Sequence, residues 1–165
     1  SAFTSNIISL MNIDNLVDYY IFLNLVSASD NTGKNTFLVK KNNLAKFNII
    51  PWDIDGSWGL HWSGTHVGYT SILSNNLYDR LMETNTNNFK TLLKQRWSYL
   101  RGDILSSAEL GQLFNNNFSK INNSKIIDIE NEKWGSNIDI YSEQQYLINW
   151  IENRLIFLDD YFDNL

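Results

Sequence analysis

The chain has 165 residues, of which 43% are hydrophobic and 14% aromatic, so it is long and apolar enough to fold around a core of its own. Its formal net charge is -5 and its 13 Lys and Arg residues are scattered, which argues against a nucleic-acid partner, because duplex DNA or RNA would require a basic face. No apolar run is long enough to span a membrane, and the absence of Cys excludes disulfides, thiolate chemistry and cysteine-based zinc sites.

The first part of the chain is predicted to form a helix and a β-hairpin. Asp14 precedes apolar residues at helical spacing, which predicts a helix over about residues 15–27. Residues 36–39 and 47–50 are short apolar runs separated by a mostly polar turn, a pattern typical of two hairpin strands. Pro51 follows the second run, as expected for a residue that cannot donate to a strand ladder.

A long irregular segment follows the predicted hairpin. Residues 57–74 show no clear hydrophobic period and contain three Gly, two His and two Trp. Segments without a period are usually loops at the protein surface, and such loops often carry function. We therefore expect residues 57–74 to be a loop.

The rest of the chain is predicted to be a bundle of helices. Apolar spacing predicts helices at about residues 76–82, 89–100, 107–118, 126–133 and 142–162. The third of these begins at a capping box from Ser106 to Glu109, and its inner face is expected to hold Leu110, Leu113, Phe114 and Phe118. The inner face of the last is expected to hold Tyr146, Trp150, Ile151, Leu155, Leu158 and Phe162. No internal repeat or domain boundary is visible, so residues 1–165 are expected to form a single domain.

Two short polar clusters bracket the predicted hairpin. Residues 30–35 (Asp-Asn-Thr-Gly-Lys-Asn) follow the first helix, and residues 51–56 (Pro-Trp-Asp-Ile-Asp-Gly) follow the second strand. An Asp, an Asn five residues later, a hairpin and a second Asp is the order in which protein kinases arrange their catalytic loop and metal ligand. There, one carboxylate orients the attacking hydroxyl, while an amide oxygen and another carboxylate hold magnesium on the phosphates. The alternative is that residues 30–35 form an ordinary polar turn, because Asp, Asn, Gly and Thr are common turn residues.

An ordinary protein kinase is excluded by what the sequence lacks. The chain contains neither a Gly-rich phosphate loop nor a Val-Ala-Ile-Lys strand. Ala28-Ser29 stands before Asp30 instead of His-Arg, and Asp53 is followed by Ile54-Asp55-Gly56 instead of Phe-Gly. An atypical kinase whose nucleotide-clamping lobe precedes Ser1 is consistent with this pattern.

Several stretches between Ile13 and Phe162 make the sequence similar to the CotH kinases, a family named after spore coat protein H. The most specific stretch is Ile-Ile-Pro-Trp-Asp-Ile-Asp at residues 49–55. The other matching positions are residues 15–19, 29–30, Asn35, 89–90, 96–97, 100–101, 150–155 and 158–159. The resemblance covers the second half of a typical domain of that family.

This resemblance implies a fold and an activity. The fold would be α+β but mainly α, corresponding to the larger (C-terminal) lobe of a protein kinase, with a small β-hairpin followed by a helical bundle. The activity would be transfer of the ATP γ-phosphate, with Mg, to Ser or Thr of a partner protein. The nucleotide-clamping lobe is expected to be absent from residues 1–165, so the isolated chain is expected to be inactive. Some family members are surface or secreted modules, which implies an extracellular or cell-surface setting for the parent protein.

The resemblance also implies roles for individual residues. Asp30 corresponds to the catalytic Asp, and Asn35 and Asp53 correspond to ligands of the metal and its nucleotide. Asp55 would either help to hold a second ion, since side chains two apart on an extended segment point the same way, or act as a turn acceptor. Lys34 would either contact a phosphate or be a solvated loop residue.

Other charged residues have simpler interpretations. Arg96 and Arg154 belong to the family pattern, but on helices beside aromatic residues they are expected to form ion pairs or to pack. His61 and His66 lie five residues apart in the predicted loop, and a zinc site would need at least one further ligand. No residue nearby has the right spacing.

Two alternative interpretations concern the segment after the hairpin. A calcium loop starting at Asp53 would need Gly and Glu where the chain has Trp58 and Gly64, so that pattern fails. Trp58, Trp62 and Tyr69 would suit an exposed aromatic platform for a sugar. The alternative function is therefore a catalytically silent surface, adhesion or carbohydrate-binding module on the same fold.

Overall fold

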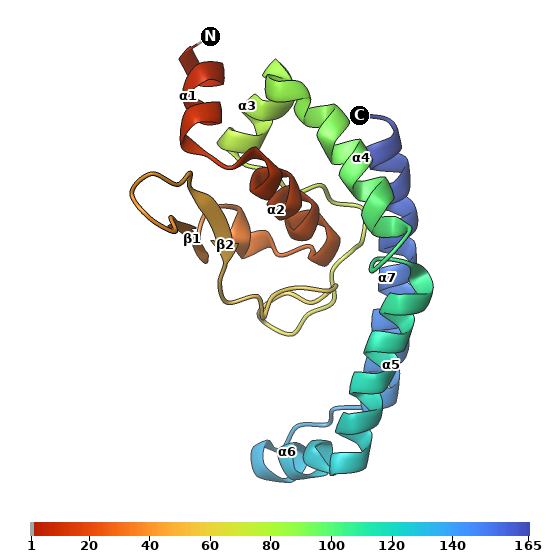
Figure 1. Cartoon of the computed structure of the whole chain (residues 1–165). Coiled ribbons are helices and arrows are strands. Elements are labelled where there is room, and N and C mark those ends of the chain that lie inside the picture. Colours follow the sequence, from red (N-terminus) through yellow and green to blue (C-terminus); the bar gives the residue numbers. More distant parts are fainter. Residues whose placement is uncertain (1) are drawn as a thin grey trace.

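The computed structural model describes residues 2–165 as seven α-helices and one two-stranded hairpin, which confirms the predicted mainly α, α+β fold (Figure 1). The elements in chain order are α1 (Ala2–Leu10), α2 (Ile13–Val26), η1 (Ser29–Thr32), β1 (Thr36–Val39), β2 (Asn48–Pro51), α3 (Asn76–Thr84), η2 (Thr86–Asn88), α4 (Phe89–Arg101), α5 (Ser107–Ser124), α6 (Ile126–Trp134) and α7 (Ile140–Asp163). Among these residues, no helix combines the length and the apolar character that crossing a bilayer would need.

Helix α2 lies at the centre of the core. Ten of its 14 residues are buried, because α4, α7 and β2 pack around it. The helix stops at Ser27, which adopts a left-handed conformation (φ 55°) and donates its backbone N–H to the carbonyl of Leu23. This C-cap turns the chain into η1 and so determines where the first polar cluster lies.

The hairpin is hydrogen-bonded to α2 and to its N-cap residue, Asn12. Strands β1 and β2 are antiparallel, with Thr36 opposite Pro51 at the open end. Asn15 in α2 accepts the backbone N–H of Ile49 at 2.6 Å and donates its Nδ2 to the carbonyl of the same residue at 3.2 Å. These two bonds fasten β2 to the core helix, so the hairpin is held beside α2 (Figure 1).

A buried arginine holds the irregular segment that follows the hairpin. Arg154 in α7 is fully buried, and its Nη1 donates to the carbonyls of Tyr69 at 2.5 Å and Ser71 at 2.7 Å. Its Nε donates to the carbonyl of Asn24 in the last turn of α2 at 2.9 Å, and Nη2 also contacts this oxygen. One guanidinium group therefore connects α7, α2 and the loop.

Two aromatic residues of α7 extend this anchoring. The hydroxyl of Tyr146 donates to the carbonyl of Gly59 at 2.6 Å, and Nε1 of Trp150 donates to the carbonyl of Val67 at 3.0 Å. Gly59 has a φ of +86°, and a Cβ there would lie 2.7 Å from the Trp150 ring. The predicted loop at 57–74 is confirmed as a segment without helices, and α7 keeps it in place.

The distal ends of α5 and α7, together with α6, form an arm away from the rest of the molecule (Figure 1). Helix α5 packs along α7, and none of the residues of α6 is buried. One half of the predicted capping box is confirmed at the start of α5, where Ser106 Oγ accepts the backbone N–H of Glu109 at 3.2 Å, while the N–H of Ser106 donates to the carbonyl of Asp103 at 3.1 Å. Leu113 was expected on the inner face of this helix, but 53% of it is exposed.

Two further expectations about the helices need correction. Helix α1 was not predicted from the sequence, although Phe3 and Ile7 are one helical turn apart and pack against the core. Helix α7 begins at Ile140 and not near Ser142, because Asp139 is the N-cap and accepts the backbone N–H of Tyr141 at 3.1 Å. The inner face predicted for this helix is otherwise buried, except for Tyr146, which is half-buried.

Candidate functional site

Asp30 lies in η1, immediately after the central helix. Its Oδ2 atom is 2.8 Å from Lys34 Nζ, and 35% of its side chain is exposed. The Lys34 side chain is 72% exposed, so this ion pair is solvated and contributes no more than about 1 kcal/mol to stability. The carboxylate of Asp30 is thus reachable from solvent.

A buried amide joins the two polar clusters. Asn31 is only 2% exposed, and its Nδ2 donates to the carbonyl of Asn35 and to the carbonyl of Trp52, each at 2.8 Å. The backbone carbonyl of Asn31 accepts the hydroxyl of Tyr19 at 2.9 Å, which ties the loop to α2 as well. Sequence reasoning did not identify Asn31, because an Asn in a polar turn looks the same whether it is solvated or buried.

Asn35 and Asp53 meet at the open end of the hairpin. The backbone N–H of Trp52 donates to the carbonyl of Asn35 at 2.8 Å, which extends the strand ladder beyond its last pair. The Nδ2 of Asn35 donates to the carbonyl of Asp53 at 3.3 Å. Both residues have left-handed backbones, with φ of 54° and 51°, a conformation that Asn and Asp tolerate better than most other residues.

Two side chains at this end of the hairpin have oxygen atoms without a partner among the described residues. Within residues 2–165, neither the Asp53 carboxylate nor Oδ1 of Asn35 accepts a hydrogen bond or takes part in an ion pair. Magnesium binds hard oxygen atoms and needs only one or two protein ligands when phosphates and waters complete its shell. An amide oxygen and a carboxylate are ligands of this kind. No group of three or more His, Cys, Asp or Glu side chains suited to a metal occurs in the described part of the chain.

Asp55 acts as a turn acceptor, which is one of the two roles expected for it. Its Oδ1 accepts the backbone N–H of Gly56 at 2.8 Å, and its carbonyl accepts the N–H of Ser57 at 3.1 Å. The backbone is not extended at Asp53, where φ is 51°, so the rule for side chains two apart on an extended segment does not apply at this residue. A role for Asp55 in metal binding therefore depends on its other oxygen.

The two histidines of the loop contact different residues. His61 Nδ1 is 2.8 Å from Ser63 Oγ. His66 Nε2 is 3.1 Å from Glu143 Oε2, and its ring stacks on Tyr146 with 3.6 Å between the centroids. Both rings thus have local partners within the chain.

The possible aromatic platform is divided between the core and the surface. Trp58 is partly buried and packs edge-on against Phe114, with ring centroids 5.1 Å apart. Trp62 is 65% exposed and Tyr69 is 38% exposed. Of these three residues, Trp62 and Tyr69 are the ones that are substantially exposed to solvent.

The two family-pattern arginines have structural partners, as expected. Arg96 pairs with Asp18, with Nε 2.7 Å from Oδ1. Arg154 is bonded to carbonyl oxygens alone among the described residues, and burial lowers its pKa to about 10, so it remains charged at neutral pH. Within the described part of the chain, neither arginine makes a hydrogen bond or ion pair with Asp30, Asn35 or Asp53.

The fold and this site together define a class of protein. It is a mainly α domain in which a hairpin connects a loop with Asp30 and Asn35 to a second Asp, Asp53. A family model described as CotH kinase protein matches residues 1–158. The chain therefore belongs to the CotH kinase family, as the sequence predicted. A search of curated proteins found no match.

Proposed function

We propose that this chain is the larger lobe of an atypical protein kinase that transfers the γ-phosphate of ATP to Ser or Thr of a partner protein. The observation that supports this proposal most is the link made by Asn31, which holds the loop carrying Asp30 and Asn35 against the segment carrying Asp53. Phosphoryl transfer depends mainly on positioning and on charge neutralisation, and both need such a link.

Each residue has a distinct role in this proposal. Asp30 accepts a hydrogen bond from the substrate hydroxyl and takes its proton as the phosphoryl group is transferred. In the free protein, Lys34 forms an ion pair with the Asp30 carboxylate. Because this ion pair is exposed, the substrate displaces Lys34 easily. Asn35 and Asp53 supply an amide oxygen and a carboxylate that would hold Mg on the phosphates, and Asp55 is a candidate for a second ion. When bound, the metal neutralises phosphate charge.

The nucleotide needs further contacts in this proposal. Residues 1–165 contain no Gly-rich phosphate loop and no strand lysine of the kinase type. We therefore assign the clamp on ATP to a lobe outside this chain. Residues 1–165 alone are then expected to bind ATP weakly and to transfer phosphate at a negligible rate. Robust transfer by these residues alone would contradict this assignment.

The test uses the native protein that carries this sequence. Cells expressing the wild-type protein, Asp30→Asn or Asp53→Asn would be compared by quantitative mass spectrometry of phosphoserine and phosphothreonine peptides. Asp103→Asn is the matched control, because this exposed Asp lies in the turn after α4. We expect a set of phosphorylated sites that disappears in the first two variants and persists in the control. Identical sites in all four strains would contradict the proposal and support a catalytically silent module.

Exposed Trp62 favours sugar binding as a second candidate function. Trp62 and Tyr69 would have to form the binding surface without Trp58, whose ring packs on Phe114. A glycan array probed with the purified chain and with Trp62→Ala tests this candidate. Binding that is lost in the variant would support it, and absence of binding to any glycan would end it.

A further inference from the structure

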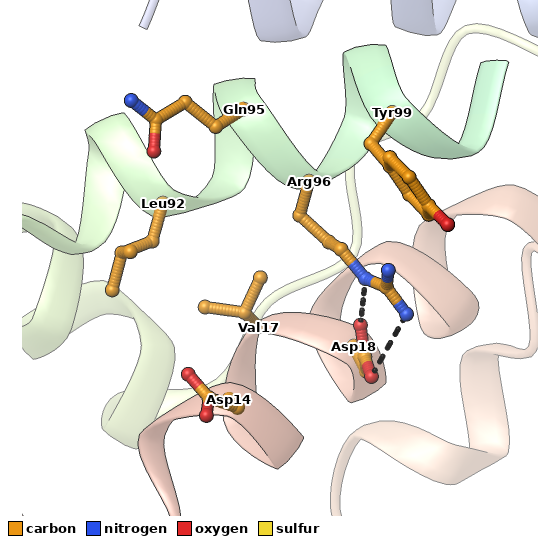
Figure 2. Close-up of a pocket in the computed structure, with 7 residues that line it drawn as sticks. All are labelled: Asp14, Val17, Asp18, Leu92, Gln95, Arg96 and Tyr99. Atoms are coloured by element: carbon orange, nitrogen blue, oxygen red, sulfur yellow. Dashed lines mark hydrogen bonds and ion pairs between the residues drawn. The ribbon is translucent and has the colours of Figure 1, made fainter. Parts of the chain in front are cut away.

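A hollow of about 410 Å³ lies between α2 and α4 (Figure 2). None of Asp30, Asn35, Asp53 and Asp55 lines it. Its size falls within the range of pockets that bind ligands in proteins, roughly 300–1,000 Å³. The hollow is therefore a possible binding site separate from the candidate site at the hairpin.

The α2 side of the hollow carries two carboxylates in different states. Asp14 and Asp18 are one helical turn apart. Asp18 accepts hydrogen bonds from Arg96, with Nε at 2.7 Å and Nη2 at 3.4 Å (Figure 2). Asp14 is exposed and makes no hydrogen bond or ion pair within the described part of the chain, although its charge contributes weakly to raising the pKa of Arg96. One carboxylate is thus neutralised, and the other still lacks a close cation.

The hollow also has an apolar part. Figure 2 shows Val17 and Leu92 between the two helices, with Asp14 beside them. Val17 is buried and Leu92 is half-buried. An aliphatic group placed there would remove apolar surface from water, at about 25 cal/mol per Å².

The cation on the α4 side is already engaged. The Arg96 guanidinium bonds to both oxygens of Asp18 and lies 5.4 Å from the centre of the Tyr99 ring. An anionic ligand would have to break this ion pair and would also meet Asp14. A cationic ligand would gain Asp14 and leave the pair intact, so charge complementarity favours a positive group.

We propose that this hollow docks a segment of a partner protein in which a Lys or Arg lies next to an aliphatic residue. The basic side chain pairs with Asp14, and the aliphatic side chain packs on Val17 and Leu92. A small free cation would leave the apolar part empty, and a second copy of this chain, with its net charge of -5, is disfavoured by like-charge repulsion. The inference does not depend on the proposed phosphotransfer.

The test is a nuclear magnetic resonance titration of the ¹⁵N-labelled chain with two peptides. The first is Gly-Ser-Leu-Arg-Ser-Gly with blocked ends, and the second carries citrulline, an uncharged analogue, in place of Arg. We expect the first peptide to shift the backbone amides of Leu92, Gln95 and Tyr99, and the citrulline peptide to bind at least threefold more weakly. Raising the salt concentration should weaken binding of the Arg peptide, since exposed charges are screened.

Variants make the test specific. Asp14→Asn should weaken binding of the Arg peptide at least threefold and leave binding of the citrulline peptide unchanged. Asp103→Asn, which removes an exposed carboxylate elsewhere, should leave both affinities unchanged. Spectra of the free variants that match the wild-type spectrum away from the substituted residue verify folding. Equal binding of the two peptides, no change in Asp14→Asn, or shifts confined to other surfaces would each overturn the proposal.

Discussion

The buried side chain of Asn31 donates a hydrogen bond to the carbonyl of Trp52 at 2.8 Å, across 21 positions of the chain. Its second donor bonds to the carbonyl of Asn35, also at 2.8 Å. Because Trp52 directly precedes Asp53, this amide group helps to set how the catalytic-type loop lies relative to the candidate metal ligand, together with the bonds that Asn35 makes to Trp52 and Asp53. An arrangement of this kind is sensitive to the loss of a single side chain.

Replacing Asn31 by Ala should destabilise the protein by about 2 kcal/mol, because it leaves two carbonyls of a buried link without their donor. Urea unfolding followed by circular dichroism measures this loss. Asn117→Ala is the control, since Asn117 is exposed on α5 and its removal should change the free energy of unfolding by less than about 0.5 kcal/mol. Equal stabilities of the two variants would show that the link contributes little.

Asp53→Asn and Asp55→Asn should differ in their effect on Mg binding by the native protein in the presence of ATP. The first removes the charge of an unpaired carboxylate, so Mg affinity should fall at least tenfold, which is about 1.4 kcal/mol. The second retains the oxygen that accepts the Gly56 N–H, so the turn survives and the loss should be smaller. Calorimetric titration with Mg compares the two. Equal losses would make Asp55 a ligand of the same rank as Asp53.

Arg154→Met should destabilise the protein by roughly 3 kcal/mol, because the carbonyls of Asn24, Tyr69 and Ser71 lose buried charged donors. Arg154→Lys should recover only part of this, since an ammonium group cannot reproduce the planar fork. Thermal unfolding measures both variants. Arg80→Lys is the control, because Arg80 is exposed on α3 and its contact with the Phe3 ring, at 4.6 Å, should contribute no more than about 1 kcal/mol. Full stability of Arg154→Lys would contradict the geometric argument.

The protein should lose stability as the pH rises above 10. Burial raises the pKa of Tyr19 to about 12, and it raises the pKa values of Tyr20 and Tyr78 further. Since an unfolded Tyr ionises near pH 10, the folded state holds these protons more tightly, and the stability they contribute is present below pH 10 and lost above it. Urea unfolding at pH 9 and pH 11 measures the difference.

Tyr78→Phe tests the assignment of this alkaline loss. The variant lacks the hydroxyl that bonds to the Leu16 carbonyl at 3.2 Å, so it should be less stable at pH 9 and should lose less stability between pH 9 and pH 11. Tyr141→Phe changes a residue that is 69% exposed and should keep the wild-type pH dependence. The assignment fails if both variants follow the wild-type curve.

The residue types of the candidate site were predictable from the sequence, but their arrangement in space was not. The Asp30, Asn35 and Asp53 pattern was identified because the order of residue types along the chain is local information. The family itself was also predictable, since residues 49–55 form a specific stretch. The left-handed backbone at Asp53 was not, because Asp is compatible with both extended and left-handed conformations. The expectation for Asp53 and Asp55 rested on an extended segment, and the backbone at Asp53 is not extended.

The sequence by itself determined the helices with clear apolar spacing, the hairpin whose second strand ends at Pro51 and the family to which the chain belongs. Only the tertiary structure decided which polar residues are buried, among them Asn31, which bonds to both clusters, and Arg154, which holds the loop. The physical reason is that hydrophobic periodicity depends on near neighbours in the chain. The burial of a polar side chain, in contrast, depends on whether distant backbone carbonyls meet it in space.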